Sequence, residues 1–112
     1  MTIESTRKYA NDLLLNINKK EILLYPRDKN LDFINKYSLS NEDIKYIVNS
    51  ITIEQFKGRI PNKDKKIHSK YLYIFKTIVE LEDEYGVIFG YVYIKICEIK
   101  PGILVVSIHI DE

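Results

Sequence analysis

The sequence is poor in the residues that build covalent and metal-held folds. Among 112 residues it has one cysteine, no tryptophan, four glycines and three prolines. Because Cys97 is the only cysteine, an intrachain disulfide is impossible, and a reducing cytoplasm fits the chain. The Cys and His residues lack metal-ligand spacing, so we expect no metal and no cofactor. We also expect no membrane span and no signal peptide, since long apolar runs are missing and residues 1–8 lack the apolar core and cleavage site of a signal peptide.

What remains is an ordinary globular composition with an uneven distribution of charge. Hydrophobic residues make up 46% and charged residues 29% of the chain, which is long enough for one domain. The net charge is only +1. Residues 57–70 are strongly basic, however, and residues 80–84 are acidic. Within the basic run, Lys63 and Lys66 are candidate contacts to phosphates. The alternative is a solvated, mobile loop.

The last twenty residues predict a β-hairpin with two different faces. Apolar and polar residues alternate in residues 92–99 and 103–110, around Pro101 and Gly102. A regular two-residue turn would mix both kinds on each face. The pattern therefore favours an odd loop or a bulge that pairs Ile99 with Ile103, Lys95 with Ser107 and Tyr93 with His109. The polar face would then carry candidate acid–base and phosphate-binding groups. Alternatively, it is the wet face of an antiparallel sheet.

The rest of the pattern indicates helices first and strands last. An apolar stripe predicts a helix over residues 5–18, and Ser40 with Asp43 forms a capping signal for another helix. Asp28 is expected to cap the helix between them. We therefore predict one α+β domain, N-terminal helices packed on a C-terminal antiparallel sheet. Its expected parts are an N-terminal helix (1–20), a short strand and two helices (21–57, with 51–57 extended), a basic loop (58–70) and the sheet (71–112, with a strand at 71–78, an acidic loop and the hairpin).

Several segments, in order, resemble one family of small bacterial toxins. Residues 25–33 are similar to its "PRxKNLxFL" segment, and residues 38–52 to "GLTxEDxKxxIxxLTxxDY". Residues 72–76 are similar to "VWVFxK". Residues 92–96 and 106–109 are similar to "xIYIKLxL" and "VxxxSFH". Together these segments resemble the MqsR-type mRNA interferases of type II toxin–antitoxin systems.

The resemblance implies a RelE/MqsR-like fold and a metal-independent endoribonuclease that cleaves mRNA by attack of the 2′-hydroxyl. It implies mRNA and a neutralising antitoxin as partners, and it leaves ribosome involvement open. The family's tyrosine and lysine on the penultimate strand fall at Tyr93 and Lys95. A family lysine on the last strand falls at His109, which suits acid–base work near neutral pH.

Other family positions are matched less directly. A family lysine falls at Gly58, so Lys57 or Arg59 would replace it, and Tyr73 stands nearest a family glutamine. On this reading the catalytic candidates are His109, Tyr93, Lys95 and Arg59, and the substrate-binding candidates are Lys57, Tyr73, Lys63, Lys66 and Ser107. Two alternatives use the same face without cleavage: a non-catalytic RNA-binding module and a protein-interaction domain.

Overall fold

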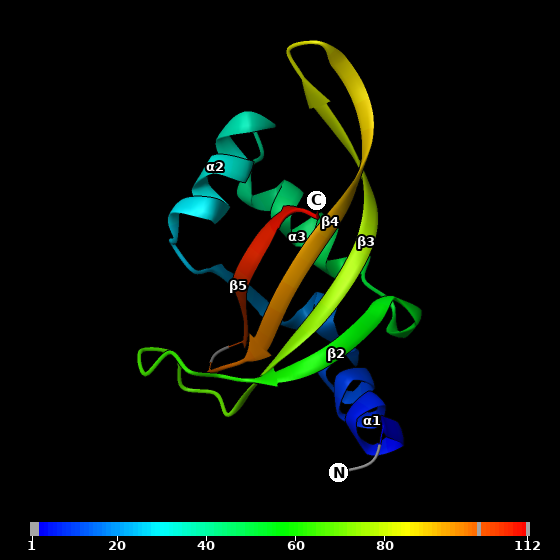
Figure 1. Cartoon of the computed structure of the whole chain (residues 1–112), viewed down its shortest axis with the longest axis vertical. Helices are drawn as coiled ribbons and strands as arrows, with labels where there is room; N and C mark the ends of the chain where they lie inside the picture. Colours follow the sequence, from blue (N-terminus) through cyan, green and yellow to red (C-terminus); the bar gives the residue numbers. More distant parts are fainter. Residues whose placement is uncertain (1–2, 101, 112) are drawn as a thin grey trace.

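The computed structural model describes residues 3–100 and 102–111 and shows an α+β fold, as predicted (Figure 1). Three helices and a five-stranded sheet form one compact body. None of the helices in these residues is long and apolar enough to cross a membrane. The elements are α1 (Ile3–Leu14), β1 (Glu21–Leu24), α2 (Asp28–Lys36), α3 (Asn41–Asn49), β2 (Phe56–Pro61), β3 (Tyr71–Asp83), β4 (Gly86–Glu98) and β5 (Gly102–Ile110), with short 3-10 turns η1 (Ile17–Lys19) and η2 (Ile53–Gln55).

The sheet is mixed, so the prediction of an antiparallel sheet is wrong at one edge. The strand order is β1-β5-β4-β3-β2. Strands β2 to β5 pair antiparallel with their neighbours, but β1 pairs parallel with β5, with Ile22 opposite Ile103 and Leu24 opposite Val105. A parallel pair needs a long crossover connection. Almost the whole chain between β1 and β5 provides it, so sequence-local patterns gave no hint of the pairing.

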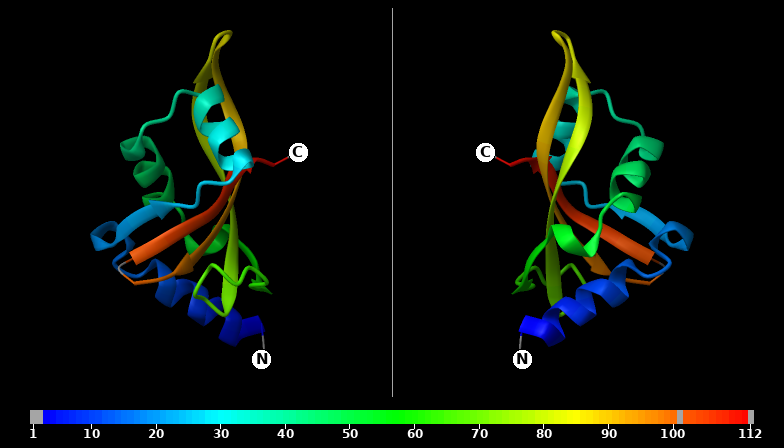
Figure 2. Two further views of the ribbon diagram at one scale, coloured as in Figure 1. Left: turned by 90° about the vertical axis from the view of Figure 1, so that its left-hand side faces the viewer. Right: turned by 90° about the vertical axis from the view of Figure 1, so that its right-hand side faces the viewer.

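The main core lies on one face of the sheet, which we call the inner face. Strand residues such as Phe75 and Ile94 have no exposed surface there. They join apolar side chains from all three helices, including Leu13, Phe33 and Val48, in one cluster. Figure 2 shows α3 standing to one side of the edge-on sheet. Burial of this apolar surface supplies the main favourable term in folding.

Helix starts follow the predicted capping signal at one helix and depart from it at another. Before α3, the Ser40 side chain accepts from the Asp43 N–H at 3.1 Å, and the Asp43 carboxylate accepts from the Ser40 N–H at 2.8 Å. This is the predicted capping box. Before α2, the N-cap residue is Arg27, and Asp28 is the first helical residue rather than the cap. The Asp28 carboxylate still lies in the first turn, where a negative charge is favourable.

Two predicted loops are partly strand. Residues 58–61, which the sequence predicts to be part of the basic loop, belong to β2, and η2 replaces part of the extended segment 51–57. The acidic residues Glu80, Glu82 and Asp83 lie within β3 rather than in a loop. Strands β3 and β4 stay paired out to Asp83 and Gly86, and they form a long hairpin arm that projects beyond the rest of the sheet (Figure 1).

The predicted bulge in the last hairpin is confirmed. Tyr93 lies opposite His109 and Lys95 opposite Ser107, with a register shift between Lys95 and Ile96. Beyond the shift the predicted pairing of Ile99 with Ile103 is wrong, because Glu98 takes that place. The Ile99 N–H donates instead to the Gly102 carbonyl at 2.8 Å. Pro101 lies outside the described residues.

The outer face of the sheet carries a second, smaller core beneath the basic segment that follows β2. Ile67 from this segment is 5% exposed and packs with Leu72, Cys97, Leu104 and Val106. Alternation predicts Leu104 and Val106 on the inner face, and this is wrong: on the turn side of the bulge they face outward, whereas Ile103 and Val105 face the main core. The polar part of the outer face begins only at Lys95 and Ser107 and continues to Tyr93 and His109.

Candidate functional site

Two ring side chains from neighbouring strands stack on the outer face. The Tyr93 and His109 ring centroids are 5.0 Å apart, and the ring planes differ by 16°. The His109 Nδ1 lies 2.9 Å from the Ile110 carbonyl oxygen, which can only accept. Nδ1 therefore carries the hydrogen of that contact, and in the neutral ring Nε2 is left with its lone pair. A histidine in this state is ready to accept a proton from a substrate.

Next to this pair, three cationic side chains from two distant segments, the start of α2 and β4, act on one another. Arg27 Nη1 donates to Ser107 Oγ at 3.1 Å, and Lys95 stands opposite Ser107. The pKa of Lys95 is lowered, first by burial and then by the positive charges of Arg27 and Lys29. Like charges held this close repel one another unless an anion joins them. The arrangement suits an anion such as a phosphate, which would be attracted by all three cations.

A buried asparagine holds the arginine in place. Asn30 has no exposed surface. Its amide nitrogen donates to the carbonyls of Tyr25 at 2.8 Å and Val106 at 3.0 Å, and its oxygen accepts from the Ile108 N–H at 2.8 Å. The side chain thus bonds β5 as a neighbouring strand would. The start of α2, with Arg27 and Lys29, is fixed beside β5 for that reason.

Tyr25 connects the basic segment to the site. The Arg27 guanidinium carbon lies 5.7 Å from the centroid of the Tyr25 ring. The Tyr25 hydroxyl donates to Asp64 Oδ2 at 3.1 Å. Asp64 belongs to the segment that contains Lys63 and Lys66. Its pKa is lowered, first by the hydrogen bond from the Lys66 N–H. Residues 62–70 form a loop, as predicted, and this loop is tied to the sheet through Tyr25 and Ile67.

An ion pair borders the stacked rings on the other side. Lys76 lies opposite Tyr93 and bonds Asp111 at 2.9 Å. The pKa of Tyr93 is raised by burial, with Lys76 lowering it and Asp111 raising it to smaller extents. The phenol therefore keeps its proton at neutral pH and can act as a proton donor.

A hollow of about 400 Å³ lies between α2 and the end of β5, beside the histidine. Its walls combine the ring of His109 with two lysines of α2, Lys29 and Lys36, and with the carboxylates of Asp32 and Asp111. A nucleotide on the outer face would have His109 at its edge and lysines within reach. This hollow is shallow rather than enclosed, which suits a polymer that passes across the surface.

Two predicted site residues lie elsewhere. Arg59 stands opposite Tyr73, whose ring packs against the inner core. The Arg59 guanidinium carbon is 3.7 Å from the Tyr71 ring centroid and 6.0 Å from that of Tyr9 in α1. Strand alternation puts Tyr71 and Tyr73 on the inner face and Lys95 on the outer. The structure therefore does not bring Arg59 or Tyr73 to the cluster that contains His109.

The other predicted lysines lie at the border of the site. Lys57 is exposed in a bulge of β2, in the row that continues through Gly58 and Ile74 to Lys95. Because β2 and β4 are two strand spacings apart, Lys57 lies about 10 Å from Lys95. Lys63 and Lys66 are exposed in the folded basic segment. In the part of the chain that the structure describes, none of these three lysines makes a hydrogen bond, ion pair or ring contact with Tyr93, Lys95, Ser107 or His109.

Sequence reasoning missed Arg27, Lys29, Lys76 and Asn30 as members of the site. Arg27, Lys29 and Asn30 stand in residues 25–33, which carry part of the family resemblance, but no role was assigned to them. The available signal was a pair of cations, Arg27 and Lys29, directly before a polar residue that proves fully buried. Their contact with β5 spans nearly 80 residues of sequence, which periodicity does not reveal.

Within residues 3–100 and 102–111, His, Cys, Asp and Glu side chains nowhere gather in threes that could hold a metal ion. In comparisons with known proteins, no protein-family model, curated protein or solved structure matches the chain.

Proposed function

We propose that the protein is an endoribonuclease that cleaves mRNA, the toxin of a type II toxin–antitoxin pair. The observation that supports this most is the convergence on one sheet face of the stacked Tyr93–His109 pair with the cations Arg27, Lys29 and Lys95. Acid–base groups beside a cluster of cations are what phosphodiester cleavage needs. The sequence resemblance points in the same direction.

The proposed reaction uses the RNA itself as nucleophile. His109 Nε2 takes the proton of a 2′-hydroxyl, and the 2′-oxygen attacks the adjacent phosphorus. The bond from phosphorus to the 5′-oxygen breaks, and Tyr93 supplies the proton to that oxygen. The products are a 2′,3′-cyclic phosphate and a 5′-hydroxyl. Arg27 and Lys95 stabilise the extra negative charge of the crowded phosphate. No step in this scheme calls for a metal.

The finer fold assignment and the partners belong to the same proposal. The chain has a RelE/MqsR-like arrangement, with helices packed on one face of a sheet whose other face binds RNA. It acts in the cytoplasm, and a cognate antitoxin neutralises it. The helix side chains gathered on the inner face and the chemistry gathered on the outer face support this division.

A second candidate is an RNA-binding module that does not cleave. Exposed aromatic rings continue the outer face beyond Tyr93 along the hairpin arm, namely Tyr91 at 56% and Phe89 at 75% exposure. Such rings stack unpaired bases, and stacking needs no acid or base. On this reading His109 contributes a ring surface only, and phosphate binding depends on Arg27 and the lysines.

One experiment separates the two functions. Purified protein is incubated with a long single-stranded RNA in EDTA, and new ends are mapped and tested for a 5′-hydroxyl. We expect specific cleavage by the wild type and a loss of about 10²–10⁴-fold on His109→Ala, as for removal of a general base. The matched control is His68→Ala, because His68 is an exposed histidine of the basic segment.

The binding affinity of the same RNA for the same variants completes the test. If wild type and His109→Ala bind equally well and neither cleaves, the protein is a binding module. If neither binds nor cleaves although both are folded, the outer face serves another purpose and the proposal is wrong. Growth arrest on induced expression, lost with His109→Ala and kept with His68→Ala, would connect the chemistry to toxicity.

A further inference from the structure

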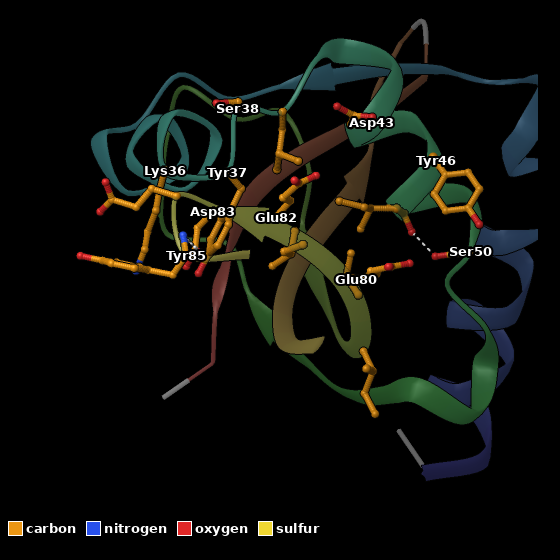
Figure 3. Close-up of a pocket in the computed structure, with 16 residues that line it drawn as sticks. Lys36, Tyr37, Ser38, Asp43, Tyr46, Ser50, Glu80, Glu82, Asp83 and Tyr85 are labelled. Carbon is orange, nitrogen blue, oxygen red and sulfur yellow. Dashed lines mark hydrogen bonds between the residues drawn. The ribbon is translucent and has the colours of Figure 1, made fainter. Parts of the chain in front are cut away.

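A large groove lies on the inner side of the hairpin arm, away from the stacked rings. It has a volume of about 1410 Å³. Its walls are the end of α2, one side of α3 and the length of β3 from Ile78 to the tip of the arm (Figure 3). Lys36 of α2 and Tyr37, the residue that follows it, border both this groove and the hollow beside His109. The groove is thus next to the proposed active site but contains none of its reacting groups.

One wall of the groove is the unpaired edge of strand β3. Strand β2 pairs with β3 only between Tyr71 and Phe75. From Lys76 to Asp83, β3 pairs with β4 alone in the part of the chain that the structure describes. About half of the N–H and C=O groups of such an edge point away from the partner strand and can receive another strand. The edge is eight residues long, or about 26 Å at the rise of a β-strand.

The side chains along this edge are acidic. Glu80, Glu82, Asp83 and Glu84 come from the arm and Asp43 from α3, while Lys36 is the cation among the lining residues. Charged residues on an edge discourage pairing with an identical edge, because like charges would meet. The same charges favour a strand that presents lysine or arginine, so this edge discriminates between partners by charge.

Apolar side chains accompany the acids. Tyr46 of α3 is 76% exposed, Ile78 is 57% exposed and Tyr85 at the tip is 90% exposed. All three line the groove. Exposed aromatic and aliphatic groups beside unpaired backbone are typical of surfaces that bind extended peptide segments. A nucleic acid would be repelled by the carboxylates, so the groove favours a protein.

We propose that the edge of β3 from Lys76 to Asp83 receives an extended segment of a partner protein, added to the sheet as a further strand. The segment alternates basic residues, which meet Glu80 and Glu82 on one face of the strand, with apolar residues, which contact Val79 and Tyr46 on the other. The proposal goes beyond the ribonuclease and is independent of it, because no group of the groove takes part in the cleavage scheme. A protein that never cleaved RNA would still bind this segment.

The test uses the full chain and synthetic peptides of about ten residues, in two sequences and two N-methylated forms. The first alternates lysine with valine and tyrosine. The second replaces each lysine by glutamate. The third keeps the lysines but carries N-methyl groups on alternate backbone nitrogens, made in both alternations. Binding is measured by fluorescence anisotropy at low salt, and amide hydrogen exchange of the protein is recorded with and without peptide.

We expect the lysine peptide to bind and to slow amide exchange within residues 76–83. The glutamate peptide should bind at least about tenfold more weakly, because its charges oppose those of the edge. One of the two N-methyl alternations should abolish binding, since it removes the donors that pair with β3. The double variant Glu80→Lys with Glu82→Lys should reverse the preference between the lysine and glutamate peptides. Glu21→Lys with Glu54→Lys, two exposed glutamates elsewhere, is the matched control.

Three results would overturn the inference. Equal binding of both N-methyl peptides would exclude strand addition. Equal binding of the lysine and glutamate peptides, or no binding of either at millimolar concentration, would exclude a basic partner. Protection of residues 76–83 in the protein alone, with a dimer in sedimentation, or by a single-stranded RNA, would assign the edge to a second copy or to nucleic acid. RNA cleavage is read separately, so failure here leaves the ribonuclease proposal standing.

Discussion

Tyr93 and His109 stack nearly parallel, 5.0 Å between centroids, because a bulge sets β4 and β5 in the register that places them opposite each other. A slip of one residue would turn one ring to the inner face and separate the pair. Lys95 and Ser107 depend on the same register. The irregularity between Lys95 and Ile96 thus allows an apolar inner face and an organised polar outer face to coexist on the same two strands.

The hydroxyl of Tyr93 is expected to serve catalysis rather than stability. Its pKa is raised by burial, so it stays protonated at neutral pH and can supply a proton. We predict that Tyr93→Phe, which keeps the ring, lowers RNA cleavage about 10²-fold while unfolding free energy changes by no more than about 0.5 kcal/mol. Cleavage rates and urea unfolding check this. Tyr85→Phe, at the exposed tip of the arm, is the control. Unchanged cleavage by Tyr93→Phe would remove the hydroxyl from the mechanism.

Lys95 is predicted to cost stability while serving RNA binding. Its pKa is lowered by burial and by the charges of Arg27 and Lys29, so the charged form of Lys95 is less favourable in the folded than in the unfolded chain. Lys95→Met should therefore raise unfolding free energy by about 0.5 kcal/mol at neutral pH, a small value because solvent screens a half-exposed group. It should also weaken RNA binding and reduce the salt dependence by about 0.7 in the log–log slope.

The pH dependence gives an independent check on Lys95. Below its folded pKa the ammonium is charged in both states, and the folded state bears the whole cost. As pH rises from the folded pKa toward the ordinary lysine value of about 10.4, the folded state sheds its proton first and the cost disappears. The stability gap between Lys95→Met and wild type should therefore shrink across this alkaline range. A gap that stays constant, or that Lys65→Met reproduces, would contradict the assignment.

Asn30 is expected to be the structural support of the site. It is fully buried and bonds Tyr25, Val106 and Ile108 at once. Asn30→Ala leaves backbone groups of β5 unsatisfied, at a cost of about 1–3 kcal/mol in unfolding free energy. Urea unfolding measures this, with the exposed Asn35→Ala in the same helix as control. The folded fraction of Asn30→Ala should also bind RNA more weakly, because Arg27 is no longer held beside Ser107. Equal stability of both variants would contradict the role.

Ile67 is predicted to hold the basic segment on the outer face. It is 5% exposed, whereas Ile60 in the preceding strand is 37% exposed. Ile67→Ala should lower unfolding free energy by about 2–5 kcal/mol, and Ile60→Ala should cost much less. Hydrogen exchange across residues 62–70 should accelerate in Ile67→Ala only. If exchange there is already fast in the wild type, the segment is a solvated loop and its lysines are not positioned.

The register of the last hairpin was predictable because it depends on residues close in sequence. Alternation along residues 92–96 and 106–110 admits one arrangement that buries the apolar set, and that arrangement pairs Tyr93 with His109. The capping box at Ser40 and Asp43 is equally local. The local pattern failed near the turn, where Ile103 pairs with Glu98 rather than Ile99. Both faces of the sheet are apolar at this end, so alternation does not select one register there.

Membership of the site was less predictable because it depends on which sheet face a residue occupies. Arg59 has the right chemistry but faces Tyr71 and Tyr9 on the inner side. Arg27 precedes a helix and reaches Ser107 only because Asn30 pairs with β5. Composition marks both as cations. It does not tell them apart, since the face of β2 and the docking of α2 are set by contacts between distant segments.

The sequence by itself determined the α+β class, the hairpin register that joins Tyr93 to His109, and the separation of basic from acidic charge. These features depend on periodicity and composition, because local sterics and the burial of apolar side chains translate such patterns directly into helices and strands. The tertiary structure decided the parallel pairing of β1 with β5, the arrival of Arg27 and Lys29 at Lys95, and the unpaired edge of β3. Each of these joins or separates segments far apart in the chain, and only the packing of the whole core selects among the alternatives.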